Sequence, residues 1–202
     1  MASQGQAIQA QEQRATARAK IVQAARELVV EEGYDAVSTA DVLARAGVSR
    51  GGLYHHFDGK QELMAAVLEA VEQDVVARLV AAVSDQPDPA SALRAGAEWF
   101  LDECLRSKEL QRAGGLEGRN ALGWETWRNT VTPYGLTLLA QTLAAAIDAG
   151  QIQPADPATL AHLILAAVHE ASALVISATD PETERARAGQ ALANLIDGLS
   201  TR

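Results

Sequence analysis

The chain has 202 residues, a formal net charge of −9 and a single cysteine, Cys104. This length suits one large domain or a small domain joined to a larger one, and one cysteine excludes an intrachain disulfide, as is usual in a reducing cytoplasm. The N-terminus lacks a signal-peptide pattern, and no apolar run approaches the roughly 20 residues that span a bilayer, so we expect a cytoplasmic protein with no membrane partner.

The acidity is confined to the later part of the chain. Residues 1–60 contain seven basic and seven acidic residues, whereas residues 61–202 contain ten basic and nineteen acidic residues and carry the whole net charge. The net charge argues against nucleic-acid binding, but a neutral first part can still present a basic face. The asymmetry predicts two functional parts.

The first predicted helix begins at Thr16 and ends at Gly33, which can take the left-handed conformation of a C′ residue. Before it, residues 1–13 are rich in Gln and Ala and have almost nothing to bury, so we expect a disordered arm there. Ser38 and Asp41 form an S-x-x-D pattern, which predicts the capped start of a second helix.

Gly47 breaks the second helix, and Ser49 can cap a short third helix. Asp58 can cap a fourth helix, whose apolar residues recur at helical spacing to about Val83.

The remainder is also helical by pattern, interrupted by Pro- and Gly-rich breaks at 85–90, 112–123 and 150–157. The segment 112–123 is expected to be irregular. The predicted helices run from about Ala90 to Arg106, from about Trp124 to Ala149 with a kink between Thr132 and Pro133, and near residues 157–178 and 181–199. The sequence has no convincing strand pattern or internal repeat, so we predict an all-α fold.

The turn AGVS (46–49) between the second and third helices suits a helix-turn-helix. The third helix is too short and too polar to form for packing alone. Leu53 and Phe57, four residues apart, can anchor it inward, and the residues left on its other faces are Arg50, Gly51, Tyr54 and His55.

A recognition helix in the major groove reaches base edges with its N-terminal residues. Arg50 can bond both acceptors of a guanine, and Gly51 and Gly52 have no side chain to keep the helix backbone away from DNA. Phosphate contacts are predicted from Tyr54 and from two helix starts, at Thr39 and Lys60.

These residues carry a resemblance. The segment 24–71 resembles the DNA-binding half of the TetR family of bacterial repressors, through its EEGY break, its AGVSRGGLYHHF core and the Lys-x-x-Leu that follows. The resemblance implies dimers that bind palindromic operator DNA and release it when a small molecule enters the C-terminal domain. It implies DNA contacts from Ser38, Thr39, Ser49, Arg50, Gly51, Gly52, Tyr54, His55 and Lys60.

One position departs from the family pattern. Ala40 stands where many members carry a polar or basic residue, so a contact is missing there or is replaced by Arg14, Arg18 and Lys20 of the N-terminal arm. We divide the chain into a disordered arm (1–13), a helix-turn-helix DNA-binding domain (14–60) and a helical ligand-binding and dimerisation domain (61–202).

Other reactive side chains give no catalytic or metal pattern. His55 and His56 point about 100° apart on a helix and cannot chelate one metal; His55 is the better DNA candidate, and His56 is expected to bond within the small domain. His162, His169 and Glu170 are either pocket groups or interface polar groups. Cys104 is interpreted as a small buried hydrophobe. We predict no enzyme activity, no metal and no cofactor.

An aromatic cluster indicates a ligand pocket in the later part. Large aromatics near Pro133, beside a glycine-rich loop, make a reasonable cavity wall, although such a stripe is more often core. The candidate ligand-binding residues are Trp99, Glu103, Arg119, Trp124, Trp127, Arg128, Tyr134 and His169.

The last two predicted helices are rich in Ala, which lets helices approach closely. The family resemblance implies that they pair with their copies in a second chain as a four-helix bundle; the alternative is an ordinary intrachain core. One short recognition helix reads few base pairs, which also favours a homodimer.

The sequence therefore predicts a ligand-responsive repressor that binds operator DNA as a dimer. The alternatives are an all-helical enzyme or small-molecule carrier, and a constitutive DNA-binding or activator protein without an effector.

Overall fold

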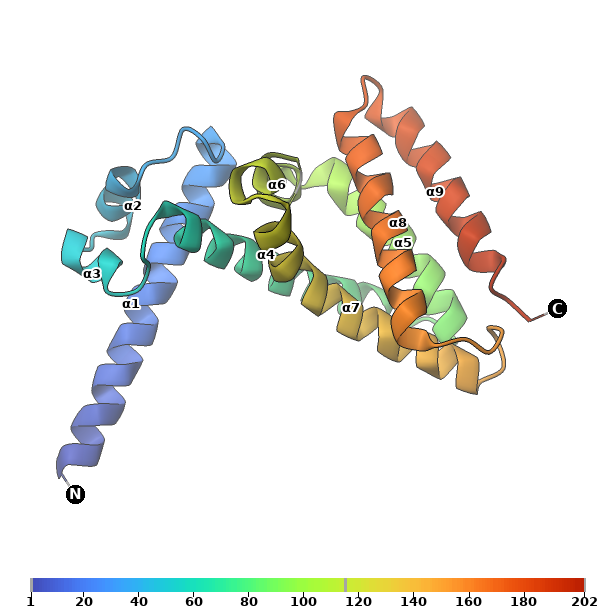
Figure 1. Cartoon of the computed structure of the whole chain (residues 1–202), viewed down its shortest axis with the longest axis horizontal. Coiled ribbons are helices and arrows are strands. Elements are labelled where there is room, and N and C mark those ends of the chain that lie inside the picture. Colours follow the sequence, from blue (N-terminus) through green and yellow to red (C-terminus); the bar gives the residue numbers. More distant parts are fainter. Residues whose placement is uncertain (1, 115, 202) are drawn as a thin grey trace.

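The computed structural model describes residues 2–114 and 116–201, which are almost entirely helical (Figure 1). The described residues contain no strand beyond an isolated antiparallel bridge between Ile152 and Ser200, as the all-α prediction requires. The helices are α1 (Ala2–Glu32), α2 (Thr39–Ala46), α3 (Arg50–Tyr54), α4 (Lys60–Val83), α5 (Pro89–Arg106), the π-helix η1 (Leu110–Gly114), α6 (Leu116–Leu122), α7 (Trp124–Asp148), α8 (Pro157–Ser177) and α9 (Pro181–Asp197).

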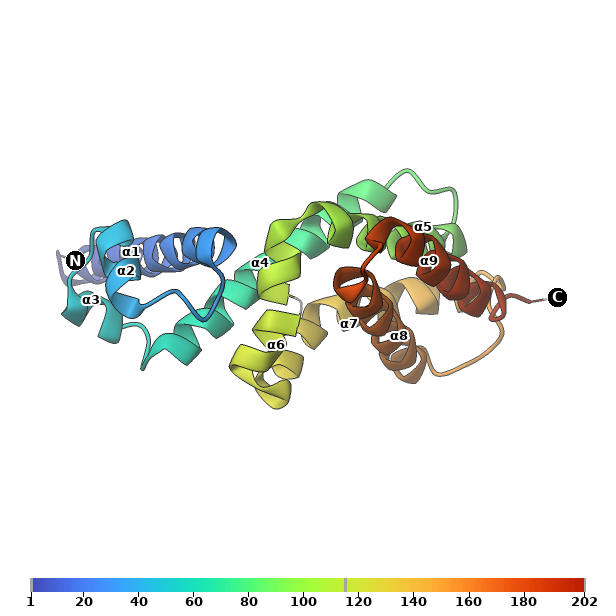
Figure 2. The ribbon, with the colours of Figure 1, turned by 90° about the horizontal axis from the view of Figure 1, so that it is seen from above.

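The helices are arranged as a small head and a larger body. In Figures 1 and 2, α1, α2 and α3 form the head at one end, and α4 leads from it into the body formed by α5 to α9. Helices α8 and α9 pack against each other on the part of the body away from the head. The predicted boundary between residues 60 and 61 falls in the first turn of α4, a helix that both parts share, and it stays a prediction.

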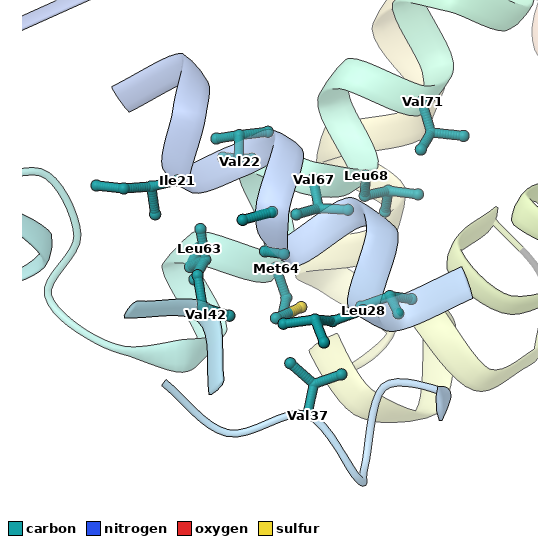
Figure 3. Close-up of a cluster of buried hydrophobic side chains, with 14 of the residues drawn as sticks. Ile21, Val22, Leu28, Val37, Val42, Leu63, Met64, Val67, Leu68 and Val71 are labelled. Carbon is teal, nitrogen blue, oxygen red and sulfur yellow. The ribbon is translucent and has the colours of Figure 1, made fainter. Parts of the chain in front are cut away.

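The head is held by an apolar core that α4 completes (Figure 3). Ile21 and Leu28 of α1, Val42 of α2, and Leu63 and Val67 of α4 point into one cluster, and each is at most 3 % exposed. These residues recur three, four or seven positions apart within their helices, so each helix presents one apolar face. Burial of these faces supplies the stability that helices as short as α2 and α3 lack on their own.

Local signals in the head act as the sequence predicted. The Ser38 hydroxyl accepts from the Asp41 backbone N–H, and the Asp41 carboxylate accepts from the Ser38 backbone N–H. Gly47 ends α2 with φ 65°, a left-handed conformation that favours glycine. Ser49 caps α3 by accepting from the Gly52 N–H. Capping bonds of this kind define where α2 and α3 begin.

Two predictions about helix ends are wrong. Residues 2–13, expected as a disordered arm, continue α1, because Ala and Gln favour helix and an extension of the anchored segment needs no new nucleus. The start of α4 is not capped by Asp58: Gly59 occupies the N-cap position, and the Asp58 backbone N–H donates to the Glu62 carboxylate at 2.6 Å.

The glycine-rich segment 112–123, expected to be irregular, is largely helical. It contains the end of η1 and all of α6. Leu110 and Leu122 are each 3 % exposed and join the core that contains the head, so buried apolar anchors hold these short helices despite their glycines. Pro133 lies inside α7, and the kink beside it stays a prediction.

Within the described residues, α8 is long and apolar enough to cross a membrane by length and composition alone, contrary to our estimate from sequence. His162, His169 and Glu170 do not lower its mean hydropathy enough to exclude it. In this structure α8 packs against α5, α7 and α9, and 22 % of its apolar window is buried within the chain.

The shared core makes a stability prediction. Leu68 of α4 is 1 % exposed, so Leu68→Ala should lower the free energy of unfolding by about 2–5 kcal/mol through lost burial and a residual cavity. Val80 lies on the same helix and is 44 % exposed, so Val80→Ala should change it by less than about 0.5 kcal/mol. Urea unfolding measures both, and equal effects would contradict the assignment of α4 as the core helix.

Candidate nucleic-acid interface and ligand cavity

Helix α3 exposes a polar face because its apolar residues are fixed inside. Leu53 is fully buried and Phe57, just after the helix, is 2 % exposed, so both anchor α3 to the head. Arg50 and Tyr54 then lie on the outside, and the Arg50 guanidinium carbon is 5.7 Å from the centroid of the Tyr54 ring. The exposed edge of α3 thus carries a cation, a phenol and glycine backbone.

The predicted DNA-contacting residues all lie outside the core. The Lys60 ammonium at the start of α4 is 4.6 Å from the centroid of the Tyr34 ring and 3.4 Å from the Asp35 carbonyl oxygen. These weak contacts leave donors of the ammonium available. The exposed members are Ser38, Ser49, Arg50, Gly51, Tyr54 and His55, and the half-buried members are Thr39, Gly52 and Lys60.

The two glycines of α3 differ in their surroundings. A Cβ placed on Gly51 would meet nothing within 4 Å, so internal packing does not require glycine at this position. A Cβ on Gly52 would touch the Ser49 hydroxyl at 3.4 Å, an ordinary contact. Because glycine in a helix costs roughly 1 kcal/mol relative to alanine, its presence at the open position 51 is explained better by an external partner than by the fold.

A second feature is a cavity of about 370 Å³ in the body, walled by α4, α5, η1, α6, α7 and α8. Five predicted ligand-binding residues line it together: Arg119, Trp124, Trp127, Arg128 and His169. The Trp124 and Trp127 rings stack with centroids 5.6 Å apart, and His169 meets the edge of Trp127 at 5.4 Å. Two tryptophans of α7 thus lie in a cavity wall, and a role in ligand binding stays a prediction.

The structure places the other three predicted residues elsewhere. Glu103 forms an ion pair with Arg78, whose guanidinium carbon is 5.8 Å from the Trp99 ring. The Tyr134 hydroxyl donates to Glu69 at 2.7 Å and accepts from Gln73 at 2.8 Å, and Tyr134 faces a different groove, between α1, α4 and α7. Tyr134 follows Trp127 by about two turns of α7, with Pro133 just before it, but its hydroxyl bonds α4 and it does not line the large cavity.

Sequence reasoning missed Glu72, which lines the cavity from α4. It is 8 % exposed, and the part of the chain that the structure describes offers its carboxyl neither a hydrogen bond nor an ion pair. Burial raises the pKa of Glu72 to about 8. A signal was present, since Glu72 occurs four residues after Leu68 and three before Val75, in the middle of the apolar face of α4.

The neighbouring titratable groups are held in neutral forms. Burial lowers the pKa of His169 to about 4, so its imidazole is neutral at pH 7. Burial, with the Glu72 and Glu103 charges, raises the pKa of the Cys104 thiol to about 12. Cys104 is 1 % exposed, which agrees with its interpretation as a small buried hydrophobe.

A smaller cavity of about 120 Å³ adjoins the first and shares Glu72, Phe100, Leu165 and His169 with it. Its remaining wall is mainly aliphatic, with Val76 and Leu79 of α4 facing Leu138 and Leu139 of α7. The residues that the structure describes contain no cluster of three or more His, Cys, Asp or Glu side chains that could hold a metal ion. The chemistry available in the cavities is therefore that of binding through apolar surface, aromatic rings and a carboxyl group.

Comparison with known proteins places both halves of the chain. Residues 21–67 match the family model described as bacterial regulatory proteins, tetR family. Residues 90–199 match the model described as tetracyclin repressor-like, C-terminal domain. A crystal structure of a TetR-family transcriptional regulator from Pectobacterium atrosepticum superposes with a TM-score of 0.82 and 28 % identity, covering 95 % of this chain and 97 % of that one.

Curated relatives match part of this chain. The chain is 38 % identical over 85 residues to the HTH-type transcriptional activator FasR of Mycolicibacterium smegmatis, covering 42 % of this chain and 39 % of that protein. It is 35 % identical over 79 residues to the HTH-type transcriptional regulator TtgR of Pseudomonas putida, covering 38 % of this chain and 37 % of that protein. The matched region thus spans about two fifths of the length of these two relatives.

The buried carboxyl predicts a pH-dependent stability. Since the folded-state pKa of Glu72 is raised from 4.5 to about 8, the unfolded chain releases this proton at a lower pH than the folded protein, and stability falls as pH rises between these values. Glu72→Gln removes this pH dependence. The free energy of unfolding of the variant, relative to that of the wild-type protein, should therefore rise between about pH 5 and pH 8, by on the order of a few kcal/mol.

Denaturant unfolding at the two pH values measures this difference. Val75→Ala, an apolar change one turn away, serves as the control, because its effect on the free energy of unfolding should be the same at both pH values. A constant offset for Glu72→Gln would contradict the burial of an unpaired acid.

Proposed function

The chain belongs to the TetR family of bacterial transcriptional regulators, and from this premise we propose that it is a ligand-responsive repressor of the cytoplasm that binds palindromic operator DNA as a homodimer. The observation that carries the proposal is the exposed edge of α3, where Arg50, Tyr54 and Gly51 have no role in the core. Regulation of transcription by a DNA-binding protein is the common activity of the matched family, and the finer assignments rest on the geometry that follows.

The head would read DNA through α3 and hold it through helix starts. Arg50 has the bidentate geometry for guanine, and Gly51 leaves room for the sugar-phosphate backbone. Tyr54 and Lys60 would donate to phosphate oxygens on either side of the groove. Ser38, Thr39, Ser49, Gly52 and His55 complete the proposed contact set.

An apolar surface on α8 and α9 supports the homodimer. Leu174 of α8 is 48 % exposed and Leu195 of α9 is 61 % exposed, although both helices otherwise pack into the body. The small residues between them, such as Ala173 and Ala191, allow a second helix pair to approach closely. Pairing of these helices with their copies would bury this surface and place two heads on one palindrome.

The route from cavity to head runs through η1 as well as α4. Leu110 lines the cavity. Its neighbour Glu109 accepts hydrogen bonds from Arg26 of α1 with both carboxylate oxygens, and the distance from Arg26 Nη2 to Glu109 Oε2 is 2.9 Å. Arg112 donates to the Val30 carbonyl of α1 at 3.1 Å. A ligand that moved η1 would therefore pull directly on the helix that supports α2 and α3.

The response is a population shift. Operator DNA favours the spacing of the two heads that matches its half-sites, and an effector in the cavity favours another spacing. The effector acts only through the difference between its affinities for the two states. By reciprocity, operator DNA changes the affinity of the cavity for the effector by the same factor.

The DNA interface gives a direct prediction. With fragments selected from a random duplex library, Arg50→Ala should weaken binding by about 1–3 kcal/mol and relax base preference at one position. Lys60→Gln should weaken binding to all sequences alike and lower the slope of log affinity against log salt by about one per head. Filter binding or fluorescence anisotropy at several salt concentrations measures both.

A matched variant controls for loss of charge alone. Arg106→Gln removes a cation that is 71 % exposed on α5 of the body, and it should leave DNA affinity unchanged. Failure of the wild-type protein to select any duplex would overturn the proposal in favour of a small-molecule carrier. Lower reporter expression after deletion of the gene would identify an activator instead.

If η1 connects the cavity to the head, a variant of η1's neighbour Glu109 should weaken the coupling between operator binding and the cavity. Operator DNA should change the emission of Trp124 and Trp127, and Glu109→Gln should reduce that change by at least half. Operator affinity itself should fall by less than about fivefold, because a partly exposed ion pair contributes at most about 1 kcal/mol. Glu182→Gln, an exposed change on α9, is the control. An undiminished emission change in Glu109→Gln would exclude this route.

A further inference from the structure

Glu72 is a buried acid without a partner inside the protein. Its neighbours along the same face of α4 are Leu68, Val71 and Val75, each at most 2 % exposed. Among the described residues nothing pairs with its carboxyl, which lines both cavities. Burial of an acid without a hydrogen bond or counter-charge costs several kcal/mol, so its position in the wall is explained by a group that enters from outside.

The walls around Glu72 suit a positive charge. Phe100, Trp127 and the neutral imidazole of His169 line the large cavity together with Glu72, and the ring centroids of Trp127 and His169 are 5.4 Å apart. The faces of aromatic rings attract cations, most strongly when water is excluded, and Trp is the best of them. Trp127 is 7 % exposed, so its ring is a desolvated surface.

The adjoining small cavity suits an aliphatic group. Glu72 and His169 line both cavities, and the small cavity is also lined by Val76, Leu79 and Leu138. A ligand that fills both cavities therefore has a polar end near Glu72 and an apolar end between α4 and α7. The volume of the large cavity, about 370 Å³, falls in the range of small-molecule sites, and the small cavity adds about 120 Å³ to it.

The basic groups of the cavity lie at its mouth. Arg128 is exposed, and Arg119 extends over the exposed Trp124 ring with 5.9 Å from its guanidinium carbon to the ring centroid. Glu170, also exposed, lies at the same rim. Solvent screens charges at the rim far more than the buried carboxyl, so Glu72 sets the charge preference of the interior.

We propose that the joined cavities bind an amphipathic organic cation, with its ammonium or amidinium group on the Glu72 carboxylate, its flat aromatic part against Trp127 and His169, and its aliphatic end in the small cavity. This inference deepens the proposed function and rests on it, because it names the chemical class of the effector.

Pair formation moves a proton. The pKa of Glu72 is about 8 in the empty protein, so the carboxyl is mostly protonated at pH 7, and an ammonium beside it favours the ionised form. Binding of an ammonium at pH 7 should therefore release up to about one proton to the buffer. The other titratable or charged groups that share the cavity are Cys104 of α5, Arg119 of α6, Arg128 of α7, and His162, His169 and Glu170 of α8.

The test uses three probes of one shape and different charge: 4-butylbenzylamine, 4-butylbenzyl alcohol and 4-butylbenzoate. Isothermal titration calorimetry with the full chain at pH 7, in two buffers of different ionisation enthalpy, gives affinity and proton release. We expect the amine to bind at least about tenfold more tightly than either other probe, with proton release for the amine alone. Equal or tighter binding of the alcohol or the benzoate would overturn the proposal.

Two isosteric variants locate the charge preference. Glu72→Gln should bind the amine and the alcohol within about threefold of each other and release no proton, while its fold is verified by circular dichroism. Glu170→Gln removes a carboxylate from the rim of the same cavity and should keep at least most of the amine preference. Retention of the full preference in Glu72→Gln would also overturn the proposal.

Operator binding separates this inference from the proposed function. If the amine binds through Glu72 and lowers operator affinity, both stand. If the amine binds through Glu72 and operator affinity is unchanged, the ligand class stands and ligand-responsive repression fails. If the alcohol or the benzoate binds better and lowers operator affinity, repression stands and the cationic class fails.

Discussion

The apolar face of α4 is the constraint on which the rest of the structure depends, because one helix belongs both to the core of the head and to the wall of the cavities. Its first turns, with Leu63 and Val67, complete the core of the head, and its middle turns, with Glu72 and Val75, wall the ligand cavities. A close-packed helix cannot bend locally without opening gaps in one of these places. Any group that displaces α4 at Glu72 therefore changes the angle at which the head leaves the body, and no separate hinge is needed for the two sites to influence each other.

The second connection is polar and lies on the other side of the head. Glu109 forms an ion pair with Arg26 of α1, and Arg112 donates a hydrogen bond to the Val30 carbonyl of the same helix. Leu110, the first residue of the π-helix, lies between these two residues in the sequence and lines the cavity. A π-helix forms less regular hydrogen bonds than an α-helix and is often found at functional sites. The head is thus fixed to the body at two points, through α4 and through η1, so a movement of the head caused by the proposed effector would be a rotation about the line that joins them.

The sequence predicted those features that local chemistry determines. Ser38 with Asp41, Gly47 and Ser49 each act through residues at most four positions away, so their caps and turns could be found without the fold. Trp124, Trp127 and Arg128 fall within two turns of one helix and were placed on the cavity together. Glu72 was missed because an acid in an apolar stripe is recognised only when the packing partner is known. Trp99 and Tyr134 were misplaced because helical spacing gives a face of α5 or α7 but not the helix that covers it.

Charge then sets how the molecule meets DNA. The body carries the whole net charge of −9, so a duplex is repelled from every approach except the one that presents the neutral head. Within the head, Arg45 pairs with Glu27 and Glu31, which offsets part of the negative charge at the end of α1. Arg18 lies over the Phe57 ring and Arg50 over the Tyr54 ring, beside α3. These two cations lie on the side of the head that we propose reads DNA. If the proposed effector rotates α4, the distance between each head and the acidic body changes, and the repulsion between the body and a bound duplex changes with it.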